Sequence, residues 1–169
     1  MPFDCDGLMA KLSELGISTN TVEHAPLRTV EEARRLRGDL PGGHVKNLFL
    51  KDQKRNFWLI VTLEEATVDL KATAAVLDAK KFSFANPAEL DQLLGIVPGA
   101  VSPFAVINDQ EGLVSLVLDE RLLDFSPLNF HPLRNDRTTA ITPPDFLKFL
   151  SATAHEPRLI RIPSNGHTP

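Results

Sequence analysis

Short apolar runs separated by polar turns follow one another along the chain, and their spacing predicts a mixture of helices and strands. Leucines at helical spacing over 4–15, followed by Gly16, predict a first helix. The apolar run 48–50 is too short for a helix and predicts a buried strand. A polar turn at 53–56 and a run of β-forming residues over 57–63 complete a predicted hairpin.

Helix and strand patterns continue to alternate irregularly after this hairpin. Asn86 has the character of an N-cap, Pro87 follows at the first helical position, and Glu89 stands at the third, so a helix is expected to run to Gly95. Further helices are expected over 29–36, 69–79 and 142–150, and further strands over 17–23, 104–108, 113–119, 138–142 and 158–162. This order favours a mixed sheet with helices packed around it over a doubly wound parallel sheet.

Length and composition fit one domain in a reducing compartment. The 169 residues are enough for a core, and 43% are hydrophobic. No apolar run reaches the roughly 18–20 residues that span a bilayer, and the N-terminus has no secretion-signal pattern. The single cysteine, Cys5, cannot form an internal disulfide. We therefore expect a cytoplasmic single domain over 1–162 and a flexible tail over 163–169.

The formal charge of −4 argues against a general nucleic-acid coat protein, because phosphate neutralisation supplies most non-specific affinity. It leaves room for local clusters of cations that recognise a few terminal nucleotides. Each of two such clusters has an alternative interpretation as a solvated face. The clusters are Lys46, Lys51, Lys54 and Arg55, and Arg28, Arg34, Arg35 and Arg37.

Several familiar kinds of catalytic site do not occur in the sequence. It contains no Gly-rich phosphate loop, no dinucleotide fingerprint and no nucleophile elbow. The histidines lack paired spacing for a metal, and nothing near Cys5 would activate its thiol. No metal or cofactor is expected.

Three segments remain as candidates for function. Lys46 and Asn47 should stand at the mouth of the hairpin, where they either reach a ligand or form a solvated strand end. The loop 98–104 is either a simple connection between a helix and a strand or a pocket wall in which Gly99 allows close approach of a ligand. His131 is either a packed core histidine or a functional group, and polar neighbours crowd its loop.

Together these segments resemble the YbaK/prolyl-tRNA synthetase-associated family of aminoacyl-tRNA editing domains, in its freestanding ProX/PrdX (ProXp-ala) branch. The resemblance covers about 20–162 in unbroken order. Its pieces are His24-Ala25-Pro26 with Thr29-Val30-Glu31-Glu32-Ala33, 46–52, 69–71, 94–104, 107–109 and 129–133. The resemblance implies a single mixed α/β domain whose sheet is partly barrel-like and surrounded by helices.

The activity implied by the resemblance is hydrolysis of alanine esterified to proline tRNA. An aminoacylation site built for proline cannot strongly exclude the smaller alanine, since the missing atoms contribute only about 1–3 kcal/mol. A second pocket that admits alanine and excludes proline would correct such errors. The implied partners are the acceptor end of aminoacylated proline tRNA and prolyl-tRNA synthetase, without a membrane, and a monomer is favoured.

The resemblance also implies roles for particular residues. Lys46 would bind the phosphate of the terminal adenosine, and Asn47 would hydrogen-bond the aminoacyl group or ribose. The backbone around Gly99 would contact the aminoacyl carbonyl, and His131 would hold the ribose or water, with its role as a general base left open. Further candidates for substrate binding are His24, Thr29, Ala100, Ser102, Pro103 and Phe130.

One departure from the family pattern and two alternative functions stay open. Arg28 stands where an apolar or aromatic residue is expected, which would alter entry to the pocket if this position borders its mouth. The alternatives are hydrolysis of Cys-tRNA(Pro), and non-catalytic binding of aminoacyl-tRNA or regulation of a synthetase.

Overall fold

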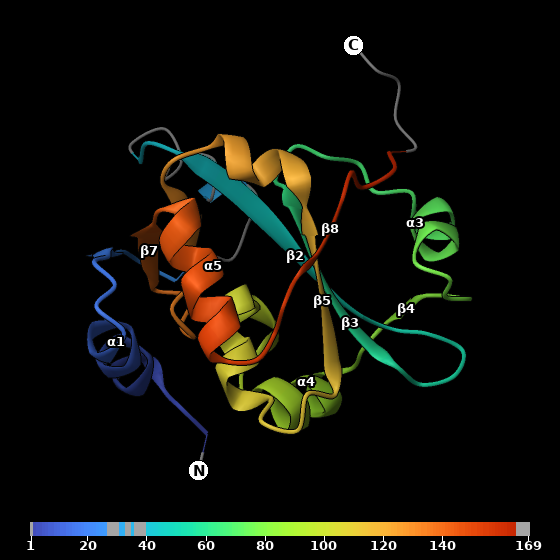
Figure 1. Ribbon diagram of the computed structural model, residues 1–169, viewed down its shortest axis with the longest axis horizontal. Helices are drawn as coiled ribbons and strands as arrows, with labels where there is room; N and C mark the ends of the chain where they lie inside the picture. The colour runs from blue at the N-terminus through green and yellow to red at the C-terminus, as the bar shows by residue number, and fades with distance from the viewer. Residues whose placement is uncertain (1, 27–30, 33–34, 36–39, 165–169) are drawn as a thin grey trace.

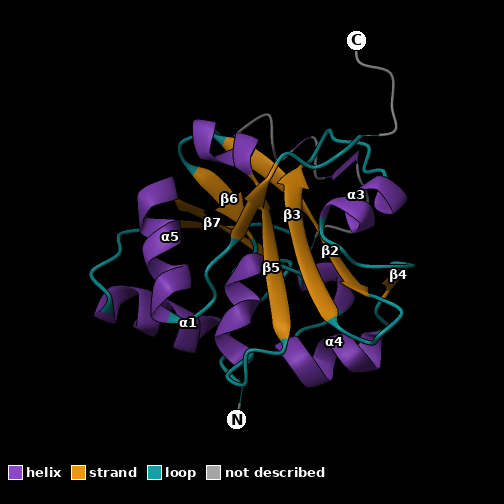
Figure 2. Ribbon diagram, turned by 45° about the vertical axis from the view of Figure 1, so that its right-hand side comes forward, coloured by secondary structure: helices purple, strands orange, loops and turns teal. Residues whose placement is uncertain are grey.

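One mixed sheet runs through the middle of the molecule, with helices on both sides of it (Figures 1 and 2). The structure is a computed structural model that describes residues 2–26, 31, 32, 35 and 40–164. Its strands are β1 (Asn20–Glu23), β2 (Gly43–Lys51), β3 (Phe57–Leu63), β4 (Ser83–Phe84), β5 (Val114–Asp119), β6 (Leu128–Phe130), β7 (Arg137–Ile141) and β8 (Arg158–Ile160).

The strand order across the sheet is β1-β7-β6-β2-β3-β5-β8, with β4 paired to the C-terminal end of β2. The pairs β2–β6, β3–β5 and β5–β8 are parallel, and the remaining pairs are antiparallel. This mixture confirms the predicted fold class, a single mixed α/β sheet with helices around it.

The helices are α1 (Cys5–Glu14), α3 (Leu70–Val76), α4 (Pro87–Leu94) and α5 (Pro143–Ala152), and the 3-10 helices are η1 (Pro98–Ala100), η2 (Pro103–Asn108) and η3 (Glu120–Asp124). Sequence signals set the ends of α4: Asn86 and Glu89 form a reciprocal capping box, and Gly95 ends the helix with φ +65°. The predicted first helix is also confirmed, with the Asp4 side chain accepting a hydrogen bond from the Gly7 amide at its start.

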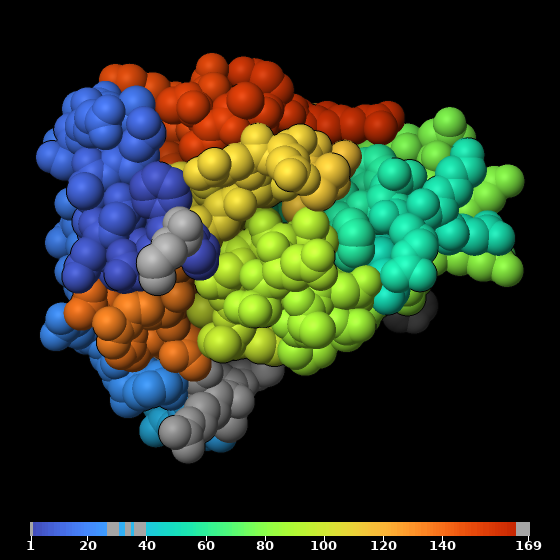
Figure 3. All heavy atoms as spheres, turned by 90° about the horizontal axis from the view of Figure 1, so that it is seen from below, coloured from blue at the N-terminus to red at the C-terminus, as the bar shows by residue number. Residues whose placement is uncertain are grey.

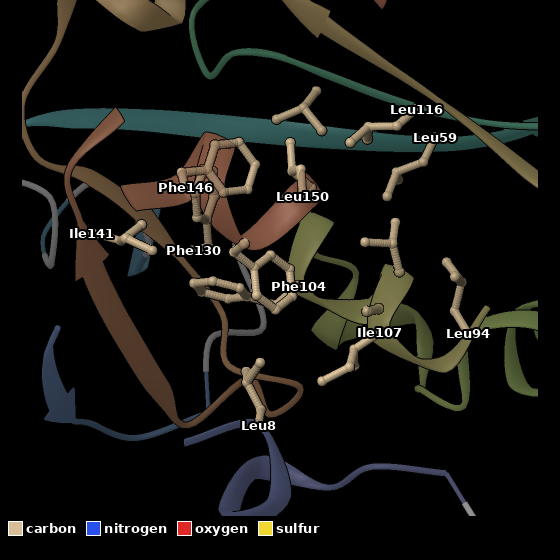
Figure 4. Close-up of a cluster of buried hydrophobic side chains, with 14 of the residues drawn as sticks. Leu8, Leu59, Leu94, Phe104, Ile107, Leu116, Phe130, Ile141, Phe146 and Leu150 are labelled. Atoms are coloured by element: carbon tan, nitrogen blue, oxygen red, sulfur yellow. The ribbon is translucent and has the colours of Figure 1, made fainter. Parts of the chain in front are cut away.

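The two faces of the sheet support two separate apolar clusters. The larger cluster lies between the sheet and α1, α4, α5 and η2, and is built around Phe104 (Figure 4). The Phe104 ring meets those of Phe130, Phe146 and Phe149 edge-on. The smaller cluster lies on the other face, where α3 packs over β2, β3 and β5. We call the face that carries the larger cluster the inner face and the face that carries the smaller cluster the outer face.

Two predictions of local structure are wrong. Residues 104–108 form part of the 3-10 helix η2, started by Ser102 as N-cap and Pro103, where a strand was expected. Phe104, Ala105, Val106 and Ile107 are all buried, and a segment buried on every side has no periodicity that separates strand from helix. Strand β2 also begins at Gly43, five residues earlier than expected.

Two further expectations fall wholly or partly on residues outside the described part of the chain. Of the helix expected over 29–36, residues 31, 32 and 35 are described and are helical, whereas Thr29 and the preceding Arg28 lie outside the described residues. Of the expected tail, Pro163 and Ser164 are described: the Pro163 carbonyl accepts a hydrogen bond from the Asp69 amide, and Ser164 forms a bridge with Val68.

Candidate functional site

Lys46 and Asn47 lie inside β2 and point to opposite faces of the sheet. Successive side chains of a strand alternate between its faces. Phe49 belongs to the inner cluster and Leu50 to the outer one. The same alternation places Asn47 on the inner face and Lys46 on the outer face. The two residues therefore cannot act as one polar pair on the same surface.

One row of residues crosses the outer face at the level of Lys46. Thr62 is the direct partner of Lys46 on β3. On the other side, the parallel register of β2 and β6 ends at His44 and Asn129, so Lys46 and His131 each lie two positions farther along. The register of β3 with β5 likewise sets Thr62 beside Asp119. Strand pairing thus brings Lys46 and His131, 85 positions apart in the sequence, to the same level of the sheet.

His131 is held in one orientation with one ring nitrogen left for a ligand. Its Nδ1 lies 3.0 Å from the Arg137 carbonyl oxygen, which can only accept, so Nδ1 carries a proton. Burial lowers the pKa of His131; the Arg137 carbonyl opposes this effect and the neighbouring His24 adds to it. The neutral ring then presents the lone pair of Nε2 as an acceptor.

His24 lies next to His131, with 6.4 Å between the ring centroids. Its Nδ1 donates to the Ala25 carbonyl oxygen at 2.8 Å, and its Nε2 lies 2.8 Å from the hydroxyl of Thr138 on β7. Thr138 also lines a cavity of about 370 Å³ that reaches Asn129 and Pro41. The predicted residues His24 and His131 are therefore brought together, and the recess lined by Thr138 includes neither ring.

A buried acidic group at the other end of the row holds an arginine. The Asp119 carboxylate, 0% exposed, accepts the Thr62 hydroxyl at 2.7 Å and two guanidinium bonds from Arg121, at 3.0 and 2.7 Å. Burial raises the pKa of Asp119, but the hydrogen bonds from Arg121 and Thr62 outweigh it and hold the pKa below its usual range. Sequence inspection did not single out these residues, because Asp119 looks there like an ordinary cap at the end of a strand.

Two contacts tie the loop after α4 to the rest of the site. Asn47 Nδ2 donates to the Val101 carbonyl oxygen at 3.1 Å, while Asn47 Oδ1 is buried and has no hydrogen-bond partner within the described part of the chain. At Gly99, an added Cβ would lie 3.2 Å from Nδ2 of Asn135, which is tighter than most such contacts. Gly99 is thus close to the loop that follows His131.

Other predicted substrate-binding residues are part of the packing beneath this loop. Ala100, Ser102, Pro103 and Phe130 are all buried. The Ser102 hydroxyl accepts a hydrogen bond from the Phe104 amide as the cap of η2. The Phe130 ring lies 4.7 Å from that of Phe146, centroid to centroid, within the inner cluster. Their observed contacts shape the loop and the core beneath it.

The first of the two cation clusters does not form one patch. Lys51 forms an ion pair with Glu89 of α4 at 2.9 Å, on the side of the sheet opposite to Lys46. Lys54 and Arg55 belong to the β2–β3 turn, which projects at the far end of the molecule together with the green segment after α3 (Figure 3). The other predicted cluster lies outside the described residues except for Arg35.

Within the described residues, no group of three or more His, Cys, Asp and Glu side chains is arranged to hold a metal ion. Among the described helices, none is both long and apolar enough to span a membrane.

Comparison with known proteins gives a consistent family for this chain. The family model described as aminoacyl-tRNA editing domain matches residues 24–149. The prolyl-tRNA editing protein ProX of Acetoanaerobium sticklandii is 35% identical over 92% of this chain and 95% of its own. A prolyl-tRNA synthetase associated domain-containing protein 1 of Xenopus laevis is 37% identical over 92% and 95%, respectively.

A more distant relative and a solved structure extend the comparison. The multifunctional Ser/Thr-tRNA deacylase ProXp-y of Escherichia coli K12 is 28% identical over 83% of this chain and 84% of its own. A crystal structure described as a candidate trans-editing enzyme for prolyl tRNA synthetase shares the fold, with a TM-score of 0.70 over 96% of this chain and 97% of that one, at 24% identity. From the matched residues and the full-length relatives, the chain belongs to the aminoacyl-tRNA editing domain family.

Proposed function

We propose that this protein is a trans-editing deacylase that hydrolyses alanine wrongly esterified to proline tRNA and so protects proline codons from mistranslation. Family membership supports deacylation of an aminoacyl-tRNA. The observation that carries the proposal is the alignment of Lys46 and His131 at one level of the outer face. A cation there can hold a phosphate while the histidine meets the ribose end of the same nucleotide.

Each of these two groups is available for a ligand. Lys46 is half-buried and takes part in no ion pair or hydrogen bond within the described residues, so its ammonium can hold the phosphate of the terminal adenosine. The Nε2 lone pair of His131 can accept a hydrogen bond from a ribose hydroxyl or from the attacking water. Asn47, on the opposite face, orients the Gly99 loop through the Val101 carbonyl.

The reaction itself needs no covalent intermediate. Water adds to the ester carbonyl, the bond from the carbonyl carbon to the ribose oxygen breaks, and a proton passes to that oxygen. The products are the free amino acid and the tRNA with its terminal hydroxyl restored. Since the ester is already activated, positioning of substrate and water by Lys46, His131 and the Gly99 loop can account for the rate enhancement.

A panel of charged tRNAs tests the proposal. Proline tRNA charged separately with alanine, cysteine, serine, threonine or proline is incubated with the protein, and release of the amino acid is followed. We expect rapid release of alanine and none of proline, since a pocket closed to proline works by size. Preferential release of cysteine would establish the alternative Cys-tRNA(Pro) activity. Preferential release of serine or threonine would align the protein with the ProXp-y relative instead.

A result with binding but no hydrolysis would contradict the proposal and favour the non-catalytic alternative, in which the protein sequesters aminoacyl-tRNA or regulates a synthetase. The same assay with added prolyl-tRNA synthetase tests that enzyme as a partner, since a partner that delivers substrate raises the rate of release. The proposal places the protein in the cytoplasm as a monomer, and light scattering checks its oligomeric state.

His131 gives the activity a defined pH dependence. Because burial lowers its pKa from the ordinary value of about 6.5, the neutral acceptor form predominates at and above neutral pH. We expect kcat/KM for Ala-tRNA(Pro) to be level above about pH 6.5 and to fall on acidification, with a midpoint below 6.5. A His131→Gln variant should lose this titration together with most of the activity. An unchanged acid limb in that variant would show that another group titrates.

A further inference from the structure

Lys46 has no neighbouring lysine or arginine on the outer face of β2. A single lysine supplies one point charge, whereas the single-stranded end of a tRNA carries a phosphate at every nucleotide. Along β2 the next cation, Lys51, lies on the other face and is paired with Glu89. The cations of the β2–β3 turn lie at the far end of the hairpin. Any partner of Lys46 on the outer face must therefore come from another strand.

Arg121 is placed to be that partner. It follows β5 directly, and the row across the sheet runs from Lys46 through Thr62 to Asp119, which holds the Arg121 guanidinium. Two strand spacings separate Lys46 from Asp119, roughly 10 Å. Long side chains that begin at this separation can contact neighbouring phosphates of one chain.

The guanidinium is oriented in advance and still has donors to offer. Nε and Nη2 bind the two oxygens of Asp119, and Nη1 has no hydrogen-bond partner within the described part of the molecule. The Arg121 side chain is 28% exposed, while that of Asp119 is 0% exposed. A buried carboxylate fixes the planar fork, so little side-chain entropy remains to be lost when an anion binds.

We propose that Arg121 is a second phosphate-binding residue, which contacts the backbone of the single-stranded 3′ end of the RNA next to the nucleotide held by Lys46. This deepens the proposed function and rests on it. Asp119 and Thr62 position Arg121 without touching the RNA. The resulting site is a two-cation row on the outer face of the sheet.

Binding of an uncharged RNA tests this inference independently of hydrolysis. The probe is a fluorescently labelled minihelix of the proline tRNA acceptor stem that ends in single-stranded ACCA, and Kd is measured at several salt concentrations. For Arg121→Ala we expect affinity about 5- to 10-fold weaker. We also expect the slope of log Kd against log salt to fall by roughly 0.7, the value for one lost contact to a single strand.

Two controls separate this effect from general charge and from misfolding. Lys148→Ala removes an exposed cation from α5, on the inner side of the sheet, and should leave both affinity and slope unchanged. The double variant Arg121→Ala/Asp119→Asn keeps the net charge and retains an acceptor for the Thr62 hydroxyl, so it avoids an unpaired buried carboxylate. It should lose the same affinity and slope as Arg121→Ala while keeping a native circular dichroism spectrum.

A third comparison locates the contact on the RNA. A minihelix without its three terminal nucleotides should bind the wild-type protein and the double variant equally. A wild-type slope and affinity in the double variant with the full probe would overturn the inference, as would an equal loss in Lys148→Ala. Failure of the proposed function would appear differently, as the absence of amino-acid release from every charged tRNA with RNA binding intact.

Discussion

Replacing Lys46 with alanine should lower kcat/KM for Ala-tRNA(Pro) by about 10- to 100-fold while leaving the fold intact. A hydrogen bond to a charged group contributes about 1.5–3 kcal/mol, and each 1.36 kcal/mol corresponds to a factor of ten in rate. Lys46 has no ion-pair partner among the described residues, so its removal leaves no buried carboxylate without a partner. Stability should change by no more than about 0.5 kcal/mol. Steady-state hydrolysis and urea unfolding measure the two quantities.

The nature of the replacement distinguishes a phosphate anchor from a proton-transfer group. Lys46→Arg keeps the positive charge and should retain much of the activity, because a phosphate accepts either cation. If Lys46 took part in proton transfer, arginine would be as damaging as alanine, since guanidinium does not deprotonate in proteins. Activity of Lys46→Ala equal to that of the wild-type protein would contradict the assignment of this residue.

Local signals in the sequence were sufficient for the elements that depend on neighbours in the chain. The helix α4 has Asn86 and Gly95 as its caps, as predicted, because the capping box and the left-handed glycine satisfy backbone groups within the same few residues. The strand over 57–63 was also predicted with its observed bounds. Such elements carry their own start and stop signals.

The arrangement of the candidate site depends on contacts that local patterns do not encode. Strand β6 has only three residues, and its parallel pairing with β2 sets His131 at the level of Lys46. The apolar run 48–50 was recognised, but the polar first half of β2 lacks an apolar pattern, so the faces of Lys46 and Asn47 were not distinguished. The row through Thr62 and Asp119 likewise appears only when β3 and β5 are paired.

A buried polar contact far from the proposed site should dominate the stability of the loop between η2 and β5. The Asp109 carboxylate accepts hydrogen bonds from the amides of Leu113 and Val114 and lies 2.9 Å from Nε2 of His155. The other ring nitrogen of His155 donates to the Thr153 carbonyl oxygen at 2.7 Å. Asp109 is 3% exposed and His155 6%, so water cannot readily replace a lost partner.

Asp109→Ala should therefore destabilise the protein by roughly 3–5 kcal/mol, a large part of the 5–15 kcal/mol typical of a domain, because it leaves several buried polar groups without partners. Asp109→Asn retains an acceptor for the loop amides and a polar group facing His155, so its cost should be clearly smaller. Asp91→Ala, at an exposed position on α4, serves as the matched control and should change stability by no more than about 0.5 kcal/mol. Urea unfolding followed by circular dichroism gives all three values. Equal stabilities of Asp109→Ala and Asp91→Ala would mean that the contact between the loop and His155 contributes nothing to the fold.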